Sequence, residues 1–261
     1  MLSARPDHAA QRRSQRSSRN AQEDRTPVTD QPTLASRLRH LPRRDLLKLV
    51  ASGAVLTAAV AWGLTLPVGA QRRKSGPTEV PLEELMKPGS LPDLALGKVD
   101  APITVVEYAS MTCGHCAAFH NKVFPALKEK YIDTGKVRLV FREFPLDNLA
   151  AAASMLARCA GGEKTFPLIS ALFHTQEAWA FVRGDPKPEL FKVVKQAGFT
   201  QESFDKCLAD QKLLDDITAV RTRGTETFGV SSTPTFFVNG KKLAGASLED
   251  FEKAFAPILK S

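Results

Sequence analysis

The stretch Met111-Thr112-Cys113-Gly114-His115-Cys116 decides the fold. It directly follows the apolar run Ile103-Thr104-Val105-Val106-Glu107-Tyr108 and directly precedes a helix-like stretch, so we expect Cys113 on the first turn of a helix that begins where a strand ends. Helix N-termini carry unpaired N–H groups and a partial positive charge. Both favour a thiolate over a thiol, which is expected to lower the pKa of Cys113 and raise its reactivity. The spacing lets Cys116 attack a mixed disulfide formed at Cys113, so we interpret the pair as a redox dithiol.

The positive charge of the chain is concentrated ahead of this region. The 261 residues carry a net charge of +8, but residues 1–48 account for +6 and Arg72-Arg73-Lys74 for +3, which leaves residues 75–261 with −1. A nucleic-acid-binding protein needs a basic patch on the folded domain itself, so that class has little support. The length allows one large domain or two small ones. The even number of cysteines, 4, fits an exported protein in an oxidising environment.

The first 70 residues have the features of an export signal. Residues 1–48 form a basic n-region that is poor in large apolar side chains, so we expect it to be disordered. It ends in Pro42-Arg43-Arg44-Asp45-Leu46-Leu47-Lys48, which resembles the twin-arginine export motif with Pro42 and Leu46 in place of the usual Ser or Thr and Phe. Residues 49–70 carry no charge and end in the small residues Val68-Gly69-Ala70, so they are either a cleaved signal h-region or a membrane anchor. Both alternatives place the body in the periplasm, in agreement with the positive charge before the segment.

A linker and a strand–helix–strand unit follow. Residues 71–92 are rich in charge and proline, so we predict a linker with one helical turn at residues 82–86. Residues 93–146 form the first part of the folded body. We expect a strand at 103–108, a helix from Cys113 to about Lys130 that bends near Pro125, and a strand at 136–142. Parallel strands joined by a helix need a right-handed crossover.

The rest of the chain divides into a helical block and a terminal hairpin with a helix. Residues 147–228 show no strand pattern, and helices are predicted over residues 149–160, 166–179, 188–196, 201–209 and 213–228. In residues 229–261, the turn Asn239-Gly240 between two strand-like runs predicts a β-hairpin. Ser247-Leu248-Glu249-Asp250 resembles a capping box and begins a last helix that ends near Leu259. The helical block is therefore an insertion between two parts of one mixed sheet.

Together these motifs resemble the thioredoxin fold. They are Cys-Gly-His-Cys at a β–α junction, Thr233-Pro234 before the hairpin, and the terminal helix. The helical block between the two halves makes residues 93–261 similar to the DsbA family of bacterial thiol–disulfide oxidoreductases. The resemblance implies an α/β thioredoxin fold with an inserted helical domain, which here follows an N-terminal export or anchor segment.

The resemblance also implies roles for the residues of the dithiol motif. Cys113 corresponds to the exposed nucleophile and Cys116 to the buried resolving cysteine. Gly114 and His115 correspond to the dipeptide that tunes the redox potential; family members often have Pro at the position of Gly114. A hydrogen bond from His115 to the Cys113 thiolate would stabilise the reduced form and make the disulfide oxidising. The alternative for His115 is an exposed loop histidine without a role.

Three further positions take roles from the same resemblance. Pro234 corresponds to the cis-proline that faces the disulfide, and Thr233 would offer backbone groups to an extended substrate. Glu107 lies in an otherwise apolar strand, where family members often have an acid. Burial raises the pKa of a carboxyl group, so Glu107 is a candidate to exchange a proton with Cys116; the alternative is a glutamate that faces solvent at a strand end.

Cys159 and Cys207 lie in the helical block. Some family members carry a second, structural disulfide there, so the resemblance implies that these two cysteines are bonded; the alternative is two inert buried thiols. Haem attachment requires His directly after the second cysteine of the motif, where this chain has Ala117. A zinc site with His115 or His120 would lack a second cysteine pair. We therefore expect neither a metal nor a cofactor.

The sequence thus predicts an exported enzyme that introduces disulfide bonds. Its substrates would be reduced, unfolded exported proteins, and a quinone-linked membrane partner would reoxidise it. The nearest alternative is a disulfide isomerase or reductase of the same fold. An alternative from a different class is a non-catalytic binding or chaperone module in which the cysteines are incidental. Nucleic acid is not expected as a partner.

Overall fold

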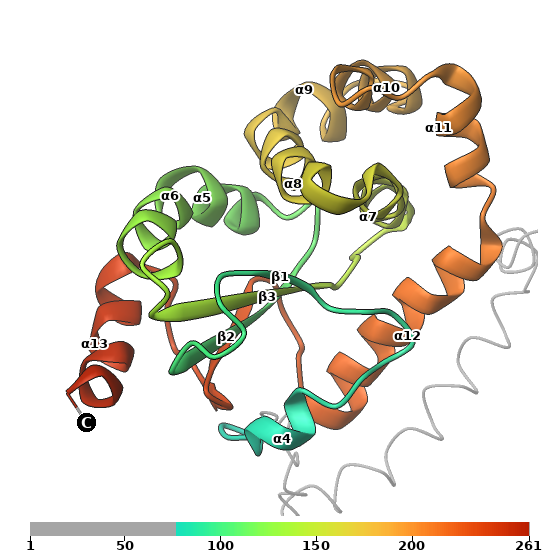
Figure 1. The fold of residues 1–261 in the computed structure, drawn as a ribbon. Helices are drawn as coiled ribbons and strands as arrows, with labels where there is room; N and C mark the ends of the chain where they lie inside the picture. Colours follow the sequence, from blue (N-terminus) through green and yellow to red (C-terminus); the bar gives the residue numbers. More distant parts are fainter. Residues whose placement is uncertain (1–76, 261) are drawn as a thin grey trace, which may run out of the picture. The chain divides into compact units, whose positions relative to one another are not determined.

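The computed structural model describes residues 77–260, in which the strands form a single sheet with the order β1-β3-β2-β4-β5 (Figure 1). β2 and β3 are parallel, and every other neighbouring pair is antiparallel. The strands are β1 (Leu94–Leu96), β2 (Ile103–Ala109), β3 (Val137–Glu143), β4 (Thr235–Val238) and β5 (Lys241–Lys242). The parallel pair and the terminal hairpin follow the predicted pattern, whereas β1 was not predicted.

The predicted n-region, the twin-arginine-like motif and the apolar segment 49–70 lie outside the described residues. Within residues 77–260, none of the helices has both the length and the apolar character that a membrane span requires.

β2 is the central strand, and its alternating side chains serve two different cores. Ile103 and Val105 pack in a cluster with Phe119 of α5 (Gly114–Lys122) and Phe251 of α13 (Leu248–Leu259). Val106 belongs to a second cluster on the opposite face of the sheet. Successive side chains of a strand point to opposite faces. Glu107 therefore continues the face that Ile103 and Val105 begin, which is the face covered by the helix that carries the dithiol.

The predicted helix from Cys113 to Lys130 consists of three shorter pieces. α5 (Gly114–Lys122) ends at Val123, α6 (Phe124–Leu127) follows, and a short π-helix continues over Lys128–Ile132. Pro125 lies in the first turn of α6, where its missing N–H is tolerated but where it cannot continue the hydrogen bonds of α5. The expected bend is thus an interruption two residues before the proline.

The insertion between β3 and β4 is helical throughout. Its members are α7 (Asn148–Ala160), α8 (Thr165–His174), α9 (Gln176–Ala180), α10 (Lys187–Gln196), α11 (Gln201–Leu208) and α12 (Gln211–Phe228), with a 3₁₀ turn at Gly162–Lys164. The predicted helix 166–179 is divided at Thr175 into α8 and α9. In Figure 1, α12 leads from α11 back toward the sheet, where the chain enters β4.

The segment predicted as a linker is part of the folded body from residue 78 onward. The expected helical turn is present as α4 (Leu82–Leu85), but Leu85 is fully buried and the backbone N–H of Val80 donates to the Gly240 carbonyl at 2.8 Å. Arg223 of α12 donates to the carbonyls of Glu84 and Lys87. Glu83 and Glu84 of α4 are exposed, while Val80 and Leu85 cover the far face of the sheet.

The predicted hairpin turn and capping box are confirmed. Asn239 and Gly240 both have positive φ, 47° and 87°, as the hairpin turn that favours Asn-Gly requires. The hydroxyl of Ser247 accepts from the backbone N–H of Asp250, whose carboxylate accepts from the backbone N–H of Ser247 in return. This reciprocal pair begins α13 (Leu248–Leu259).

A disulfide joins two helices of the insertion. It links Cys159 at the end of α7 to Cys207 on α11, across a sequence separation of 48 residues. In the chain-entropy account, a cross-link of this loop length removes about 4 kcal/mol of conformational freedom from the unfolded state.

We expect the double variant Cys159→Ala/Cys207→Ala to lose about 4 kcal/mol of unfolding free energy, because its unfolded chain is no longer cross-linked. Equilibrium denaturant unfolding of the oxidised proteins measures the difference. When both proteins are reduced, the variant and the wild-type chain should unfold at nearly the same denaturant concentration. Equal stability of the oxidised wild-type protein and the variant would contradict the stabilising role of this bond.

Candidate active site

Cys113 occupies the N-cap position of α5. Its sulfur accepts a hydrogen bond from the backbone N–H of Cys116 at 3.3 Å, and its thiol donates to the carbonyl oxygen of Thr233 at 3.3 Å. The residue retains only 8% of its surface exposed. The sulfur therefore lies at the helix start that the sequence predicts, and a loop from the far end of the chain covers it.

The surroundings of Cys113 stabilise its thiolate. The hydrogen bond from the Cys116 side chain makes the largest contribution in lowering the pKa of Cys113 to about 5, against an ordinary value of 9.0. The side chain of Thr233 and the backbone N–H groups of Cys116 and His115 lower it further, while burial opposes them. The Thr233 hydroxyl is buried without a hydrogen-bond partner, so it is available to donate to the thiolate.

Cys116 is shifted in the opposite direction. Its side chain is fully buried one turn into α5. Burial makes the largest contribution in raising the pKa of Cys116, and the hydrogen bond with Cys113 and the negative charge of Glu107 raise it further. At neutral pH the reduced site thus holds a thiolate at Cys113 and a thiol at Cys116.

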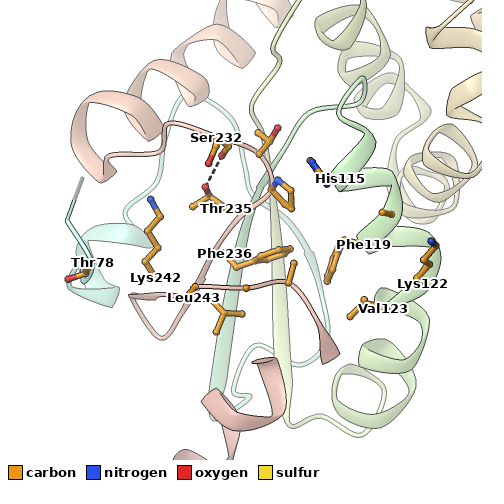
Figure 2. A pocket seen from close by; sticks show the side chains of 16 residues that line it. Thr78, His115, Phe119, Lys122, Val123, Ser232, Thr235, Phe236, Lys242 and Leu243 are labelled. Atoms are coloured by element: carbon orange, nitrogen blue, oxygen red, sulfur yellow. Dashed lines mark hydrogen bonds between the residues drawn. The ribbon is translucent and has the colours of Figure 1, made fainter. Parts of the chain in front are cut away.

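The peptide bond between Thr233 and Pro234 is cis. Pro234 lines a groove of about 710 Å³ beside the dithiol. Figure 2 shows His115, Phe119 and Lys122 of α5 on one side of this groove, and Phe236 and Leu243 of the hairpin on the other.

Gly114 and His115 are both exposed. A Cβ atom at Gly114 would meet no atom within 4 Å, so packing does not require glycine at this position. His115 contributes its backbone to the stabilisation of the Cys113 thiolate. Among the described residues, no hydrogen bond joins the His115 ring to the sulfur, in contrast to the interaction that the sequence suggested; the ring lines the groove instead.

Glu107 is fully buried rather than facing solvent. Its two carboxylate oxygens lie 3.0 and 3.1 Å from Nε2 of His120, which follows Cys116 by one turn of α5. Sequence reasoning assigned His120 no role in the dithiol chemistry. Its i+4 spacing from Cys116 was a signal that both residues share one face of the helix.

Gln176 is a second residue that sequence reasoning missed. Its buried side-chain amide donates to the carbonyl oxygens of Met111 at 2.7 Å and Cys113 at 3.1 Å. Gln176 begins α9, so the helical insertion fastens the loop that carries the nucleophile. A second attachment joins the Thr112 hydroxyl to Asp147, the N-cap of α7, at 2.7 Å. No sequence motif marks Gln176, because its partners are backbone atoms 63 and 65 residues away.

The described residues contain no group of three or more His, Cys, Asp or Glu side chains placed to hold a metal ion. The chemistry available at this site is that of the two sulfurs and of the carboxylate and imidazole beneath them.

An acidic thiolate at a helix start, a buried partner thiol and a facing cis-proline on this sheet define a site for thiol–disulfide exchange on a thioredoxin-like fold. The family model described as Thioredoxin matches residues 90–256. The structure is similar to alpha-DsbA1 of Wolbachia pipientis, with a TM-score of 0.63 and 34% sequence identity over 69% of this chain and 96% of that chain. The chain belongs to the thioredoxin family, among its DsbA-like disulfide oxidoreductases.

Two curated relatives agree with this assignment. A protein of Rickettsia bellii, provisionally named a protein-disulfide oxidoreductase, is 38% identical over 163 residues, which are 62% of this chain and 62% of the relative. A protein of Bacillus anthracis, provisionally named disulfide bond formation protein D, is 30% identical over 176 residues, 64% of this chain and 78% of the relative. The chain thus matches less than two thirds of the length of the Rickettsia protein.

We expect Cys113 in the reduced protein to titrate with a midpoint near pH 5, because its pKa lies well below that of a free thiol. The reduced protein then gains stability relative to the oxidised protein as pH rises from about 5 to about 9, and loses it as pH falls through 5. Thiolate absorbance and the alkylation rate measure the midpoint, with Cys113→Ser as the blank. A midpoint near that of free cysteine would contradict the proposed stabilisation of the thiolate.

We expect Gln176→Leu to lower the unfolding free energy by about 1–3 kcal/mol, because two buried carbonyl groups lose their donor. It should also slow thiol exchange, since the loop that holds Cys113 is no longer fixed. Denaturant unfolding and the alkylation rate of Cys113 test both effects. Gln196→Leu, on the exposed side of α10, is the matched control and should change neither.

Proposed function

We propose that the chain is an exported oxidase that introduces disulfide bonds into reduced, unfolded proteins through Cys113 and Cys116. The observation that carries the proposal is the thiolate at Cys113, with a pKa of about 5, beside the cis bond before Pro234. A dithiol whose reduced form is stabilised in this way forms a disulfide that readily takes electrons from other thiols.

The reaction begins with the enzyme oxidised. A substrate thiolate attacks the sulfur of Cys113, the Cys113–Cys116 bond breaks, and Cys116 leaves with the electron pair and takes up a proton. A second substrate thiolate then attacks the substrate sulfur of the mixed disulfide, and Cys113 leaves as a stabilised thiolate. The products are an oxidised substrate and a reduced enzyme, so two electrons pass to Cys113 and Cys116.

The groove beside Pro234 is the proposed substrate site. It offers apolar surface from Phe119, Phe236 and Leu243, and Thr233, just before β4, also lines it. An extended peptide gains backbone hydrogen bonds by adding to a strand. Unfolded substrates present extended backbone, whereas a folded protein does not, which favours an oxidase that acts before its substrates fold.

Glu107 is the proposed group that exchanges a proton with Cys116. It lies on the face of β2 covered by α5, and its charge acts on the Cys116 thiol. A carboxylate in this place can accept the proton when Cys116 attacks and return it when Cys116 leaves.

Export is proposed from the N-terminal sequence. The twin-arginine-like motif and the uncharged segment 49–70 support delivery to the periplasm, with the segment either cleaved or kept as an anchor. The bond between Cys159 and Cys207 fits an oxidising compartment. A membrane partner linked to quinone would accept the electrons from the reduced site.

The low pKa of Cys113 favours oxidase over reductase, because a stable thiolate is a poor donor of electrons to other disulfides. An isomerase would need to act on wrongly paired disulfides, and a binding module would work without either sulfur. The three alternatives therefore differ in their dependence on Cys113 and on the state of the substrate.

We expect the oxidised protein to accelerate disulfide formation in a reduced, unfolded test protein, and Cys113→Ser to reduce the rate to that without enzyme. Cys116→Ala cannot form the internal disulfide, so it is first converted by glutathione disulfide to a mixed disulfide of Cys113 with glutathione. A test protein with a single cysteine then displaces glutathione, and its mixed disulfide with Cys113 should accumulate because no second sulfur is present to break it. Regained activity of the test protein and mass spectrometry measure the two results.

Cys159→Ala/Cys207→Ala, assayed where it is folded, should keep the wild-type rate. Faster recovery of a scrambled substrate than of a reduced one would favour the isomerase, and activity of Cys113→Ser would favour the binding module.

A further inference from the structure

The ring of His120 lies in an aromatic enclosure beneath the dithiol. It stacks on Phe173 of α8 with ring centroids 4.3 Å apart, and Phe119, Phe124 and Phe141 pack around it. Only 5% of the residue is exposed. Nδ1 is buried without a hydrogen-bond partner. Within residues 77–260, the hydrogen-bond partner of the ring is the carboxylate of Glu107, which is itself fully buried.

This arrangement is not explained by stability. Four phenylalanine neighbours would accept a fifth phenylalanine, whereas histidine leaves one nitrogen unpaired, and an unpaired buried polar atom costs stability. A buried ionic or polar pair is also weak evidence for a stabilising role, because apolar residues of similar volume often serve a fold as well or better. The contact that distinguishes histidine from phenylalanine here is the one with Glu107.

The effect of that contact on Glu107 follows from elementary electrostatics. A carboxylate surrounded by apolar groups takes up a proton unless donors or positive charge stabilise its ionised form. The neighbouring strands place Phe141 and Phe236 opposite Glu107, and neither can donate. Nε2 of His120 is within hydrogen-bond distance of both oxygens. Among the described residues it is the only donor recorded for this carboxylate, and Cys116 is the other titratable group that its charge reaches.

We propose that His120 is a positioning residue for the proposed reaction: it holds the carboxylate of Glu107 in place, so that this buried group can accept the proton of Cys116. The inference rests on the proposed function and adds a residue to its machinery. When the reduced enzyme is reoxidised, Cys113 first forms a mixed disulfide with the oxidant. Cys116 then attacks Cys113, its proton passes to Glu107, and the oxidant's thiolate leaves with the electron pair.

The test is reoxidation of the reduced protein by glutathione disulfide, followed from pH 5 to pH 9. We expect His120→Phe to keep the aromatic packing and to slow the Cys116 step by about 10²-fold or more, since positioned bases contribute about 10²–10⁴-fold. The rate of its Cys116 step should stay below that of wild type across this pH range. His120→Gln retains an amide donor and should recover part of the rate. His174→Phe, at an exposed position on α8, is the matched control and should behave as wild type.

Two further variants separate positioning from packing. Because His120 acts through Glu107, His120→Phe/Glu107→Gln should be no slower than Glu107→Gln alone. His120→Phe/Glu107→Leu should be at least as resistant to denaturant as wild type while lacking the fast Cys116 step. A wild-type pH profile in His120→Phe, or additive losses in the double variant, would overturn the proposal.

The thiolate absorbance of Cys113 distinguishes this proposal from the proposed function. Its midpoint near pH 5 should be retained in His120→Phe, because the Cys113 contacts do not involve the ring. If the midpoint is ordinary in the wild-type protein, the proposed function fails. If the midpoint is low and the reoxidation profile of His120→Phe is unchanged, only the role of His120 fails.

Discussion

The sulfur of Cys113 must be reached by a substrate while the protein stabilises its negative charge, and the N-cap of α5 meets both demands. An N-cap side chain faces the unpaired N–H groups of the first turn, so a sulfur in this position accepts from the backbone without being buried inside the helix. The hydrogen bond from Cys116 and the nearby Thr233 hydroxyl add to the same effect. The rest of the site serves to keep this helix start in place.

The same helix gives its second sulfur the opposite character. Three residues further along α5, Cys116 lies in the apolar interior and above the negative charge of Glu107, both of which favour the thiol. The two thiols therefore differ in pKa because Cys113 accepts hydrogen bonds at the helix start, whereas Cys116 is buried beside a negative charge. Under the proposed function, this asymmetry makes Cys113 the sulfur that a substrate attacks, while Cys116 takes up or releases a proton in each reaction.

Local signals predicted the parts of the fold that depend on local chemistry. The strand before the dithiol, the Asn239-Gly240 turn and the Ser247 capping box each follow from residues close in sequence. Contacts between residues far apart in the sequence could not be predicted from such local signals. Residues 71–92 were predicted as a linker because their charges are visible in the sequence, whereas the burial of Leu85 depends on a sheet face made elsewhere. Gln176 has no motif, because it binds backbone atoms that any residue supplies.

His120 and Glu107 show how such partners can be found from the sequence all the same. Each departs from the apolar pattern of its own element: Glu107 in a strand that is otherwise buried, His120 on the buried face of a helix. A buried glutamate or a buried histidine without a partner lowers stability. Each is tolerated here because the other lies on the facing element. A folded chain keeps buried polar groups mainly where they have a function. Two buried polar residues that the topology brings to one face of the sheet therefore indicate a functional site. Here they lie near the buried sulfur of Cys116, whose proposed reaction consumes and releases a proton.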